Sequence, residues 1–541
     1  MSWLQLSRDR TAVRLNRQAA AVIALLALAG LALRLILLIA ADWRYDYDEG
    51  MVGLQVLRIL RGARPVFHPG QPYLGALESY LIAPQFALFG ASAITLKIVP
   101  WLLSGGYIAT TGWLGWLAFG RRVGVISALL AACAPAYLLV VGMKTWGATA
   151  ETPVLGNLAL IAASCAAAGS GSPGQQRRAF LALGLLAGVG FWVSWLIAFY
   201  LVPAALVLIF SGRDRLRRHG WAAALAFLAG SAPFWVYNLR HGGATFNYLL
   251  SEQGDGWRSL GPVLDHLTYD LAPRLVSGDP TWQLLSWDAV WWLQIVYEGG
   301  LVGLIVWGWR GSWPVSGRAA RRLLALFAAG VPLIYLASGY GNHALNEFGF
   351  DATGRYVLML HSALPIGAAA LAVWLARRRR GWWIAAAVLI SVIGLNLLGA
   401  ARIRPAQVFV SPYYTRQPAT LQPLIAFLDE QGIRHVWTDV GVAHVLMFET
   451  RERILAADWY DIYGARGLLR FPEVPLAIAA AERVAFVEVI LPGQVETRFE
   501  QAFRASGVPH VVTRVAPDLL VIVPLAPIDP ALLGDGLGYQ F

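Results

Sequence analysis

The sequence predicts a polytopic α-helical membrane protein that ends in a separate α/β domain. Of its 541 residues, 57% are hydrophobic and only 14% are charged, and the mean hydropathy is +0.55. These values lie outside the range of soluble globular proteins. Long apolar segments fill residues 1–400, whereas charged residues and short alternating patterns return in residues 401–541. We therefore expect a membrane-embedded module at 1–400 and an appended domain at 401–541.

About eleven apolar segments are each near the length needed to cross a hydrocarbon layer of about 30 Å. They are residues 19–41, 94–119, 123–141, 152–168, 180–192, 195–210, 221–237, 295–309, 323–338, 357–376 and 382–400. Two assignments have alternatives. Residues 180–210 form either one long tilted helix or a short hairpin pair, and residues 73–89 form either a further span or an interfacial helix in the first outer loop.

Arginine clusters in the loops between these segments set the expected topology. Most of the net charge of +11 lies in these short loops, so it indicates orientation by the positive-inside rule and no nucleic-acid partner. The clusters are Arg8, Arg10, Arg14 and Arg17; Arg121 and Arg122; Arg177 and Arg178; Arg213, Arg215, Arg217 and Arg218; Arg318, Arg321 and Arg322; and Arg377 to Arg380. No small-residue cleavage site follows the first apolar segment, which indicates a retained anchor. We therefore expect a multi-pass protein of the cell (inner) membrane. With a cytoplasmic N-terminus and an odd number of crossings, the C-terminal domain is expected on the extracytoplasmic side.

Residues 401–541 are predicted to form an extracytoplasmic α/β domain. Strands are expected at 408–410, 435–439, 453–457, 484–490, 510–515 and 519–524, and helices at 420–431 and 494–505. No glycine-rich phosphate loop follows these strands, which favours a substrate-selecting or lid role over nucleotide binding. Asp458 and Asp461 fit a solvated turn better than a metal site. Cys133 and Cys165 lie in apolar segments, so we expect neither a disulfide nor a zinc site.

Three carboxylates directly follow the first span: Asp46, Asp48 and Glu49. An ionised carboxylate at headgroup depth, partly withdrawn from water, is a competent general base for a hydroxyl nucleophile. Asp48 is the candidate for this role, with Glu49 beside it as a second catalytic candidate. The structural alternative is that these acids stabilise the N-terminus of the next helix. The Asp-x-Asp pattern also leaves a divalent cation open as a cofactor.

A sugar carried on a prenyl phosphate would need only one such base, because the leaving phosphate requires no proton. Glycoside hydrolysis, in contrast, uses paired carboxylates. The phosphate would instead need cationic support. Arg355 at the start of a span and Arg34 inside the first span are the candidate phosphate-binding residues. For each, the alternative is that the aliphatic part of the side chain only carries the charge to the membrane interface, without a ligand. Lys144 fits that alternative alone.

Other polar residues in the outer loops are candidates for catalysis or substrate binding. Glu151 opens a span and is either a second catalytic acid or a first-turn or capping acid of its helix. The substrate-binding candidates are Asp46, His68, Gln71, Tyr73, Glu78, His241 and Tyr356. Anchoring in an aromatic belt is the alternative for the run from His68 to Glu78, which is expected on an interfacial helix. A satisfied interfacial pair is the alternative for Asn238 and His241. A fourth loop adds His343, Asn346, Glu347 and Asp351.

Several motifs resemble a known family. They are Tyr47-Asp48-Glu49-Gly50 after the first span, residues 65–78 and 88–92, and Gly354-Arg355-Tyr356-Val357 before a late span. With them the chain resembles the GT-C superfamily of membrane glycosyltransferases, in the branch of the protein O-mannosyltransferases and the aminoarabinose transferase of lipid A (glycosyltransferase family 39-like). The resemblance covers roughly the whole chain.

This resemblance implies inverting transfer of a sugar from a polyprenyl-phosphate-linked donor to a hydroxyl acceptor at the extracytoplasmic face, with Asp48 as the base. Protein, glycolipid and cell-wall glycan all remain open as acceptors. Glu151 falls near the family's second acidic position, where members often have Asp after Arg-Pro, whereas this chain has Ala148-Thr149-Ala150-Glu151.

Two other function classes compete with the transferase. A transporter or flippase of a lipid-linked sugar usually has charged sites near the midplane and inverted repeats, but here the acids gather at one face and no repeat is visible. A non-catalytic scaffold that displays the α/β domain is the other alternative.

Overall fold

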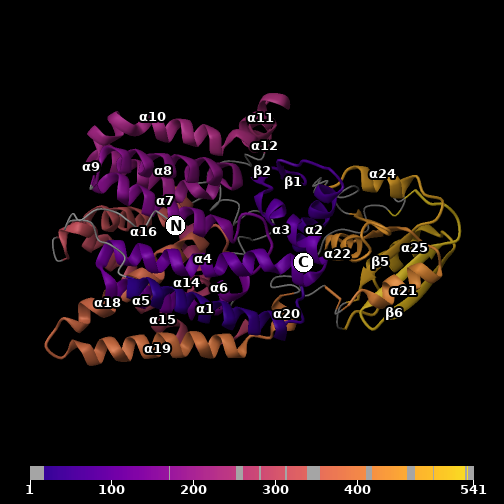
Figure 1. Cartoon of the computed structure of the whole chain (residues 1–541). Coiled ribbons are helices and arrows are strands. Elements are labelled where there is room, and N and C mark those ends of the chain that lie inside the picture. The colour runs from indigo at the N-terminus through magenta and orange to yellow at the C-terminus, as the bar shows by residue number, and fades with distance from the viewer. Residues whose placement is uncertain are drawn as a thin grey trace. The chain divides into compact units, whose positions relative to one another are not determined.

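The computed structural model describes residues 17–169, 171–251, 260–278, 282–310, 313–337, 354–409, 417–418, 420–459, 470–490, 493–529 and 533. By its internal contacts the chain divides into two compact units. The first unit comprises Met1–Ala40, Tyr73–Gly75 and Val99–Pro405, and the second comprises Ala41–Pro72, Ala76–Ile98 and Ala406–Phe541. The first unit is helical, and the second combines the segment after the first helix with a C-terminal sheet (Figure 1).

The described helices of the first unit follow the predicted apolar segments, except for three short helices between residues 244 and 276, a region where no apolar segment was predicted. They are α1 (Arg17–Ala40), α4 (Ala93–Phe119, with its first residues in the second unit), α5 (Arg121–Ala132), α6 (Ala136–Val141), α7 (Glu151–Ala168), α8 (Pro173–Val193), α9 (Ala198–Ser211), α10 (Arg213–Gly230), α11 (Ala232–Arg240), α12 (Ala244–Ser251), α13 (Leu260–His266), α14 (Ala272–Val276), α15 (Trp287–Trp309), α16 (Arg318–Ala337), α18 (Leu364–Ala376) and α19 (Gly381–Arg402).

Seven helices in the described part of the chain are long and apolar enough to cross a membrane. They are α1, α4, α7, α15, α19, and α16 and α18 together with the short turns that precede them. The pair α10 and α11, bent by 59°, would make eight. The polytopic helical class is thus confirmed, and the count of eleven crossings stays a prediction.

Residues 180–210 form a hairpin pair and not one tilted helix. The guanidinium of Arg215, at the start of α10, donates to the carbonyls of Ala167 at 2.6 Å and Ser211 at 2.9 Å. Ser211 ends α9, and Ala167 lies in the last turn of α7, just before α8 begins. The start of α8 and the end of α9 therefore lie at the same end of the bundle, and the chain reverses between them at residues 194–197.

Close backbone approach joins α8 to α10, which run side by side in Figure 1. A Cβ atom at Gly184 would lie 2.1 Å from the carbonyl oxygen of Ala223, and one at Gly188 would lie 2.2 Å from that of Phe227. Two glycines four residues apart on one helix face are a common means of packing helices in membranes, where no hydrophobic effect drives association.

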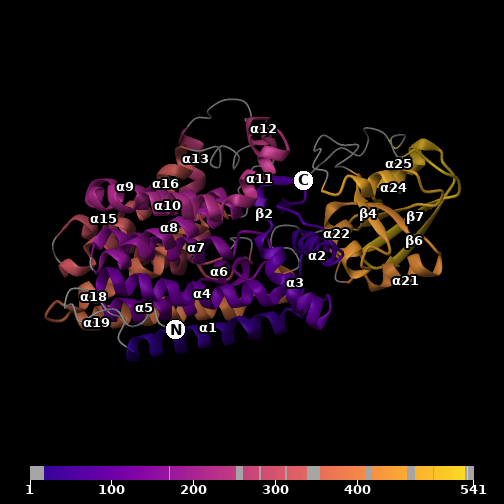
Figure 2. The ribbon, with the colours of Figure 1, turned by 45° about the horizontal axis from the view of Figure 1, so that its top comes forward.

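Helices α1 and α5 also lie side by side, as Figures 1 and 2 show. The predicted segment 123–141 is interrupted between α5 and α6 at residues 133–135, because Pro135 has no N–H to continue the ladder of α5. The last carbonyls of α5 are consequently left for other donors. The guanidinium of Arg34 from α1 takes two of them, those of Ala131 and Ala132.

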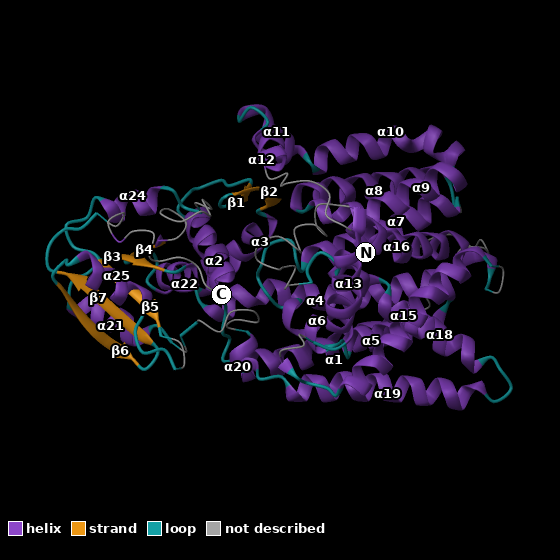
Figure 3. Ribbon diagram, turned by 180° about the vertical axis from the view of Figure 1, so that it is seen from behind, coloured by secondary structure: helices purple, strands orange, loops and turns teal. Residues whose placement is uncertain are grey.

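The second unit contains a five-stranded mixed sheet (Figure 3). The strand order is β4-β3-β5-β7-β6, with β4, β3 and β5 parallel to one another and β7 antiparallel to both β5 and β6. The strands are β3 (His435–Thr438), β4 (Leu455–Asp458), β5 (Ala485–Val489), β6 (His510–Ala516) and β7 (Leu519–Pro524), and the helices of this region are α20 (Pro405–Val408), α21 (Gln422–Glu430), α22 (Val440–Glu449), α24 (Glu473–Ala479) and α25 (Arg498–Ser506). The α/β class is confirmed.

Two features of this domain differ from the prediction. The strand expected at 408–410 is wrong at its first residue, because Val408 ends α20, and residue 410 lies outside the described residues. Helices α22 and α24 were not predicted. Most of α22 is buried, because it packs against β3 and β4 and also against helix α2 (Tyr47–Leu60), so it lacks the polar face that would reveal helical periodicity.

The first outer loop does not form the single interfacial helix that was predicted for the run from His68 to Glu78. It forms α2 (Tyr47–Leu60), a hairpin of β1 (Phe67–His68) and β2 (Gln71–Gly75), and α3 (Leu77–Phe89). His68, Gln71 and Tyr73 are therefore in strands, and only Glu78 of that run is helical. With 13 residues, α3 is about 20 Å long and too short to span a bilayer, so the alternative of a further span at 73–89 is wrong.

Candidate functional site

The acidic motif forms the first turn of α2. Asp46 is the N-cap: its carboxylate accepts from the Glu49 backbone N–H at 3.0 Å, and the Glu49 carboxylate accepts from the Asp46 N–H at 3.1 Å. This reciprocal capping box confirms the structural interpretation for Asp46 and Glu49. Asp48, the second residue of the helix, is half-buried and takes no part in the box. The box therefore fixes the backbone on both sides of the Asp48 side chain.

Glu49 has a second partner in Lys97, near the start of α4. The Lys97 ammonium forms an ion pair with Oε1 of Glu49, and both side chains are completely buried. The ring of Phe409 lies 5.4 Å from the ammonium. Both carboxylate oxygens of Glu49 are thus occupied in holding the turn. Lys97 was not among the predicted residues, although a lysine in the first turn of an apolar span is a signal that could have identified it.

Helix α22 of the C-terminal domain packs against the same turn. The ring of His444 hydrogen-bonds with the backbone of Tyr47. A Cβ atom at Gly50 would lie 3.2 Å from the carbonyl of His444, and one at Gly53 would lie 2.6 Å from the ring of Phe448. Glycine at these positions allows α2 and α22 to come this close, which gives a packing reason for the glycine of the Tyr47-to-Gly50 motif.

Burial changes the pKa of several groups around this contact. The pKa of the Tyr45 hydroxyl is raised well above its usual value by burial and by the charge of Glu449, and burial also raises the pKa of Glu449. The pKa of His444 is lowered to about 3 by burial and by the charge of Arg470. The His444 imidazole is therefore neutral near pH 7.

His68 is buried at the turn of the hairpin. Neither of its ring nitrogens has a hydrogen-bond partner within the described residues, and burial, with a contribution from Arg470, lowers its pKa to about 3. Arg470 donates to the carbonyl of Pro69 at 3.1 Å. Glu78 is also buried, whereas Gln71 and Tyr73 are half-buried.

A buried amide network ties the hairpin to its neighbours. Gln55 of α2 donates to the Phe67 carbonyl at 2.7 Å and accepts from Ser79 of α3 at 2.7 Å. Buried hydrogen bonds thus join β1 and α3 to α2, the helix that begins with the acidic turn.

Glu151 is the first residue of α7 and is buried. Ala150, the N-cap, has no side-chain capping bond, so Glu151 is a first-turn acid and not the cap itself. Gly147 and Ala148 before it have φ values of +60° and +61°. Its carboxylate lies near the backbone of Ala148 without a hydrogen bond of good geometry to any described residue.

The Gly354-Arg355-Tyr356 element packs against two residues of the first unit. Gly354 has a φ of +62°, and a Cβ there would lie 3.1 Å from the Tyr137 hydroxyl and 3.2 Å from Cδ of Arg274. The guanidinium of Arg355 donates to the Tyr356 hydroxyl at 3.2 Å. Arg274, nearly buried, pairs with Asp270 at 3.1 Å. The structure therefore brings a second arginine to the Arg355 turn, and the sequence analysis did not single it out.

The remaining predicted residues have local partners. Arg34 is buried and donates to the Gly30 carbonyl as well as to the two carbonyls of α5. His241 is exposed and stacks on Tyr237. Asn238 bonds with Phe234 and Thr245, and His241 with the Tyr237 carbonyl, so both side chains have local partners but do not form the predicted pair with each other. Tyr73 stacks on Tyr248 at 5.3 Å.

Two predictions concern residues that carry no structural description. His343, Asn346, Glu347 and Asp351 lie outside the described residues, as do Tyr460 and Asp461. The solvated turn predicted at Asp458 is wrong for that residue, because Asp458 ends strand β4 and is buried. Within the described ranges no three metal-ligating side chains gather in one place.

Comparisons with known proteins identify the fold. No protein-family model and no curated protein matches the sequence. The structure is similar to ArnT from Cupriavidus metallidurans in the apo state, with a TM-score of 0.60 and 15% identity over 93% of this chain and 98% of that one. ArnT bound to undecaprenyl phosphate gives a TM-score of 0.53, at 14% identity over 94% and 98% of the two chains. The oligosaccharyltransferase of Archaeoglobus fulgidus in complex with zinc and sulfate gives 0.50, at 13% identity over 86% and 67%. The chain therefore shares the fold of ArnT over nearly the full length of both chains.

Proposed function

We propose that the protein is a membrane-embedded glycosyltransferase that moves a sugar, with inversion, from a polyprenyl-phosphate-linked donor to an acceptor hydroxyl. The observation that carries this proposal is the likeness to ArnT over nearly the full length of both chains, including the form bound to undecaprenyl phosphate. We propose that the protein works in the inner membrane, with its N-terminus in the cytoplasm and its C-terminal domain outside. Protein, glycolipid and cell-wall glycan are the candidate acceptors.

Asp48 is proposed as the general base. Its carboxylate would take the proton of the acceptor hydroxyl as the hydroxyl oxygen bonds to the anomeric carbon from the face opposite the phosphate. The bond between that carbon and the phosphate oxygen breaks, and its electron pair leaves with the phosphate, which inverts the anomeric centre. General base catalysis of this kind contributes about 10²–10⁴-fold to a rate.

The departing phosphate gains negative charge and needs donors that are already in place. Arg355 is the predicted cation for it, and we add Arg274 because it lies against the same glycine turn. A guanidinium suits this role because its fork of donors matches two phosphate oxygens. We propose that Arg34 is an anchor between helices, because three carbonyl oxygens already accept from its guanidinium.

The other predicted residues divide by burial. Glu49 is proposed to position Asp48 and not to touch substrate, because Lys97 and the capping box engage its carboxylate. Glu151 stays a candidate second acid. Asp46 is buried and is proposed to act through the helix turn that it caps, whereas buried Glu78 and His68 are proposed to have a structural role. Four residues stay candidate substrate contacts: Gln71, Tyr73 and Tyr356, which are partly exposed, and His241, which is exposed.

The test uses the full chain in lipid nanodiscs. The donors are synthetic undecaprenyl-phosphate hexoses and pentoses, the acceptors are serine- and threonine-containing peptides, lipid A and cell-wall glycan fragments, and released undecaprenyl phosphate is measured. Asp48→Asn is expected to lower turnover by about 10²-fold or more. The matched control is Asp42→Asn, an exposed acid whose φ of +50° asparagine also accepts.

Full turnover by Asp48→Asn at unchanged protein level would refute the base assignment. Movement of labelled donor across a liposome membrane without any transfer, by the wild-type chain, would instead support the transporter alternative.

A further inference from the structure

We propose that the C-terminal domain positions the catalytic turn of α2, and that Glu452 is the residue through which it holds the far end of that helix. This inference rests on the proposed function, because it gives α2 its catalytic role. It assigns to the domain a part in the rate of the chemical step in addition to any part in selecting the acceptor.

Helix α22 accompanies α2 along most of its length within the second unit. Near the acidic turn, His444 bonds with the backbone of Tyr47 and its own backbone lies against Gly50. One turn further along, the ring of Phe448 fills the space left by Gly53. Phe448 also meets Tyr45 edge-on at 5.6 Å and stacks with Phe86 of α3 at 5.9 Å. This continuous contact means that α2 cannot tilt without displacing α22.

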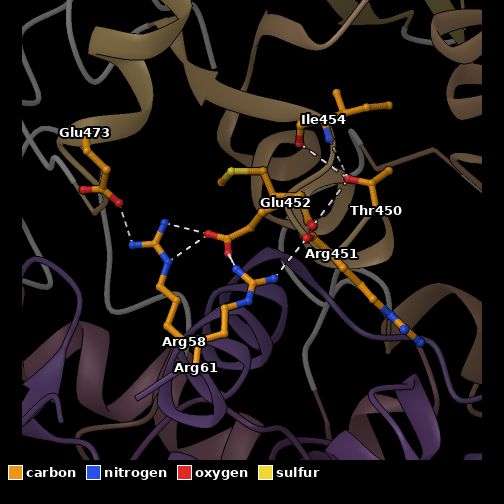
Figure 4. Close-up of polar contacts among 8 residues, drawn as sticks. Arg58, Arg61, Thr450, Arg451, Glu452, Ile454 and Glu473 are labelled. Carbon is orange, nitrogen blue, oxygen red and sulfur yellow. Dashed lines mark hydrogen bonds and ion pairs between the residues drawn. The ribbon is translucent and has the colours of Figure 1, made fainter. Parts of the chain in front are cut away.

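An ion-pair cluster closes the other end of the contact (Figure 4). The guanidinium of Arg58 lies 2.7 Å from the carboxylate of Glu452 and 2.6 Å from that of Glu473, and Arg61 pairs with the second oxygen of Glu452. Arg61 also donates to the Arg451 carbonyl at 3.2 Å. Only 11% of the Glu452 side chain is exposed, so these charges attract each other more strongly than a pair on an open surface would.

The backbone that presents Glu452 is strained. Arg451 and Glu452 have φ values of +52° and +62°, and neither is glycine. Each such residue costs about 1–2 kcal/mol and persists only where surrounding contacts impose it. Thr450 supplies such contacts, because its hydroxyl donates to the Leu446 carbonyl. It also accepts from the Ile454 N–H (Figure 4). The turn between α22 and β4 thus aims one carboxylate at two arginines of α2.

The cluster is too far from Asp48 to touch reacting groups. Arg58 follows Asp48 by ten residues, about 15 Å along a helix. Glu452 is therefore a positioning residue that acts through the rigid body of α2. Misplacement of a catalytic group by about 1 Å can cost on the order of 10²-fold in rate, so a loosened helix should reduce turnover more than substrate affinity.

The experiment compares two acids of the same domain that each bind two arginines. Glu452→Gln is expected to lower kcat by about 10-fold while KM for the donor changes by less than about 3-fold. The control is Asp429→Asn, because Asp429 pairs with Arg434 and Arg453 and makes no ion pair with α2. It should leave both constants within about 2-fold. The double variant Glu452→Gln/Arg61→Met should lose little more than the more affected of its two single variants, since they share one contact.

A variant without charge change tests the near end of the contact. Gly50→Ala would press a Cβ against the His444 backbone and should lower kcat in the same manner, whereas Gly394→Ala, a helical glycine with nothing within 4 Å of the added atom, should not. Wild-type kcat in both Glu452→Gln and Gly50→Ala would overturn the proposal.

Hydrogen exchange separates this proposal from the assignment of Asp48. Glu452→Gln should speed amide exchange in residues 47–52, and Asp429→Asn should leave it unchanged. Equal exchange in the two variants refutes the positioning role. Asp48→Asn could retain full turnover while amides of residues 47–52 exchange faster in Glu452→Gln. That result would refute the base assignment and support the role of Glu452 in positioning α2.

Discussion

The carboxylate of Glu49 and the ammonium of Lys97 form an ion pair from which solvent is completely excluded. The two residues belong to different helices, and Glu49 lies next to the proposed base in sequence. Because two charges removed from water depend on each other, this pair makes the acidic turn sensitive to a residue 49 positions away from Asp48 that no motif marks.

Loss of Lys97 should therefore destabilise the protein. Lys97→Met leaves the Glu49 charge buried without its partner, and we expect a cost of about 3–5 kcal/mol. The double variant Glu49→Gln/Lys97→Met removes both charges and should be more stable than Lys97→Met alone. Thermal unfolding in detergent, followed by tryptophan fluorescence, shows which of the two variants is more stable. A double variant that is less stable than Lys97→Met would contradict this account.

Acid should destabilise the second unit through His68 and His444. Their native pKa values are about 3, whereas an unfolded histidine has a pKa of about 6.5. Between these values the unfolded state binds protons that the native state does not, so the free energy of unfolding falls as pH falls, by about 1.4 kcal/mol per unit for each histidine. Above pH 6.5 the two groups add no pH dependence.

Thermal unfolding at pH 7.5 and pH 5.0 tests this dependence. His68→Phe should reduce the difference between the two melting temperatures, and His241→Gln, which alters an exposed histidine, should not. The same difference in wild type and His68→Phe would show that His68 is not a source of the acid sensitivity.

Gly184 should not tolerate a side chain. The atom that a Cβ would meet at 2.1 Å is the backbone oxygen of Ala223, which cannot rotate away. Gly184→Ala is expected to cost about 1–3 kcal/mol despite the better helix propensity of alanine. Gly174→Ala, near the start of the same helix, meets no atom closer than 3.9 Å and should be neutral or slightly stabilising. Equal melting temperatures for the two variants would contradict the packing of α8 on α10.

Arg34 and Arg355 should respond differently to removal of their charge. Arg34→Met leaves the Ala131 and Ala132 carbonyls at the end of α5 without their donor, so the melting temperature should fall. Arg355→Gln should raise KM for the polyprenyl-phosphate donor by about 10-fold, the loss of roughly one charge-assisted hydrogen bond, with little effect on melting. A raised donor KM in Arg34→Met at wild-type stability would restore Arg34 as a phosphate-binding residue.

Hydropathy and arginine spacing predicted the helical class because a span is a local property of 18 or more apolar residues. The C-terminal strands were also predicted well, since β-branched residues flanked by turns are local signals. In contrast, α22 is apolar on several faces because it is covered on several sides, and the sequence alone does not show what covers it. The β1–β2 hairpin was missed for a similar reason, because buried His68 and half-buried Tyr73 look like interfacial residues.

The acidic motif shows where prediction of a site ends. The sequence allowed both a capping and a catalytic interpretation, and the structure confirms capping for Asp46 and Glu49. Lys97 and Arg274 come from distant segments, so their approach to the predicted residues depends on helix packing that no local pattern encodes. The role of Asp48 itself stays a prediction for the experiments above.

The make-up of the second unit also bears on how the chain is synthesised. Its first part, Ala41–Pro72 and Ala76–Ile98, leaves the ribosome some three hundred residues before Ala406–Phe541, the part that covers it. Until α22 has been synthesised, the glycine-lined face of α2 lacks the helix that packs against it, and contacts this distant in sequence form slowly. Newly made protein should therefore form the contact between α2 and α22 late in synthesis, and chains shortened after α19 should be early targets of quality-control proteases.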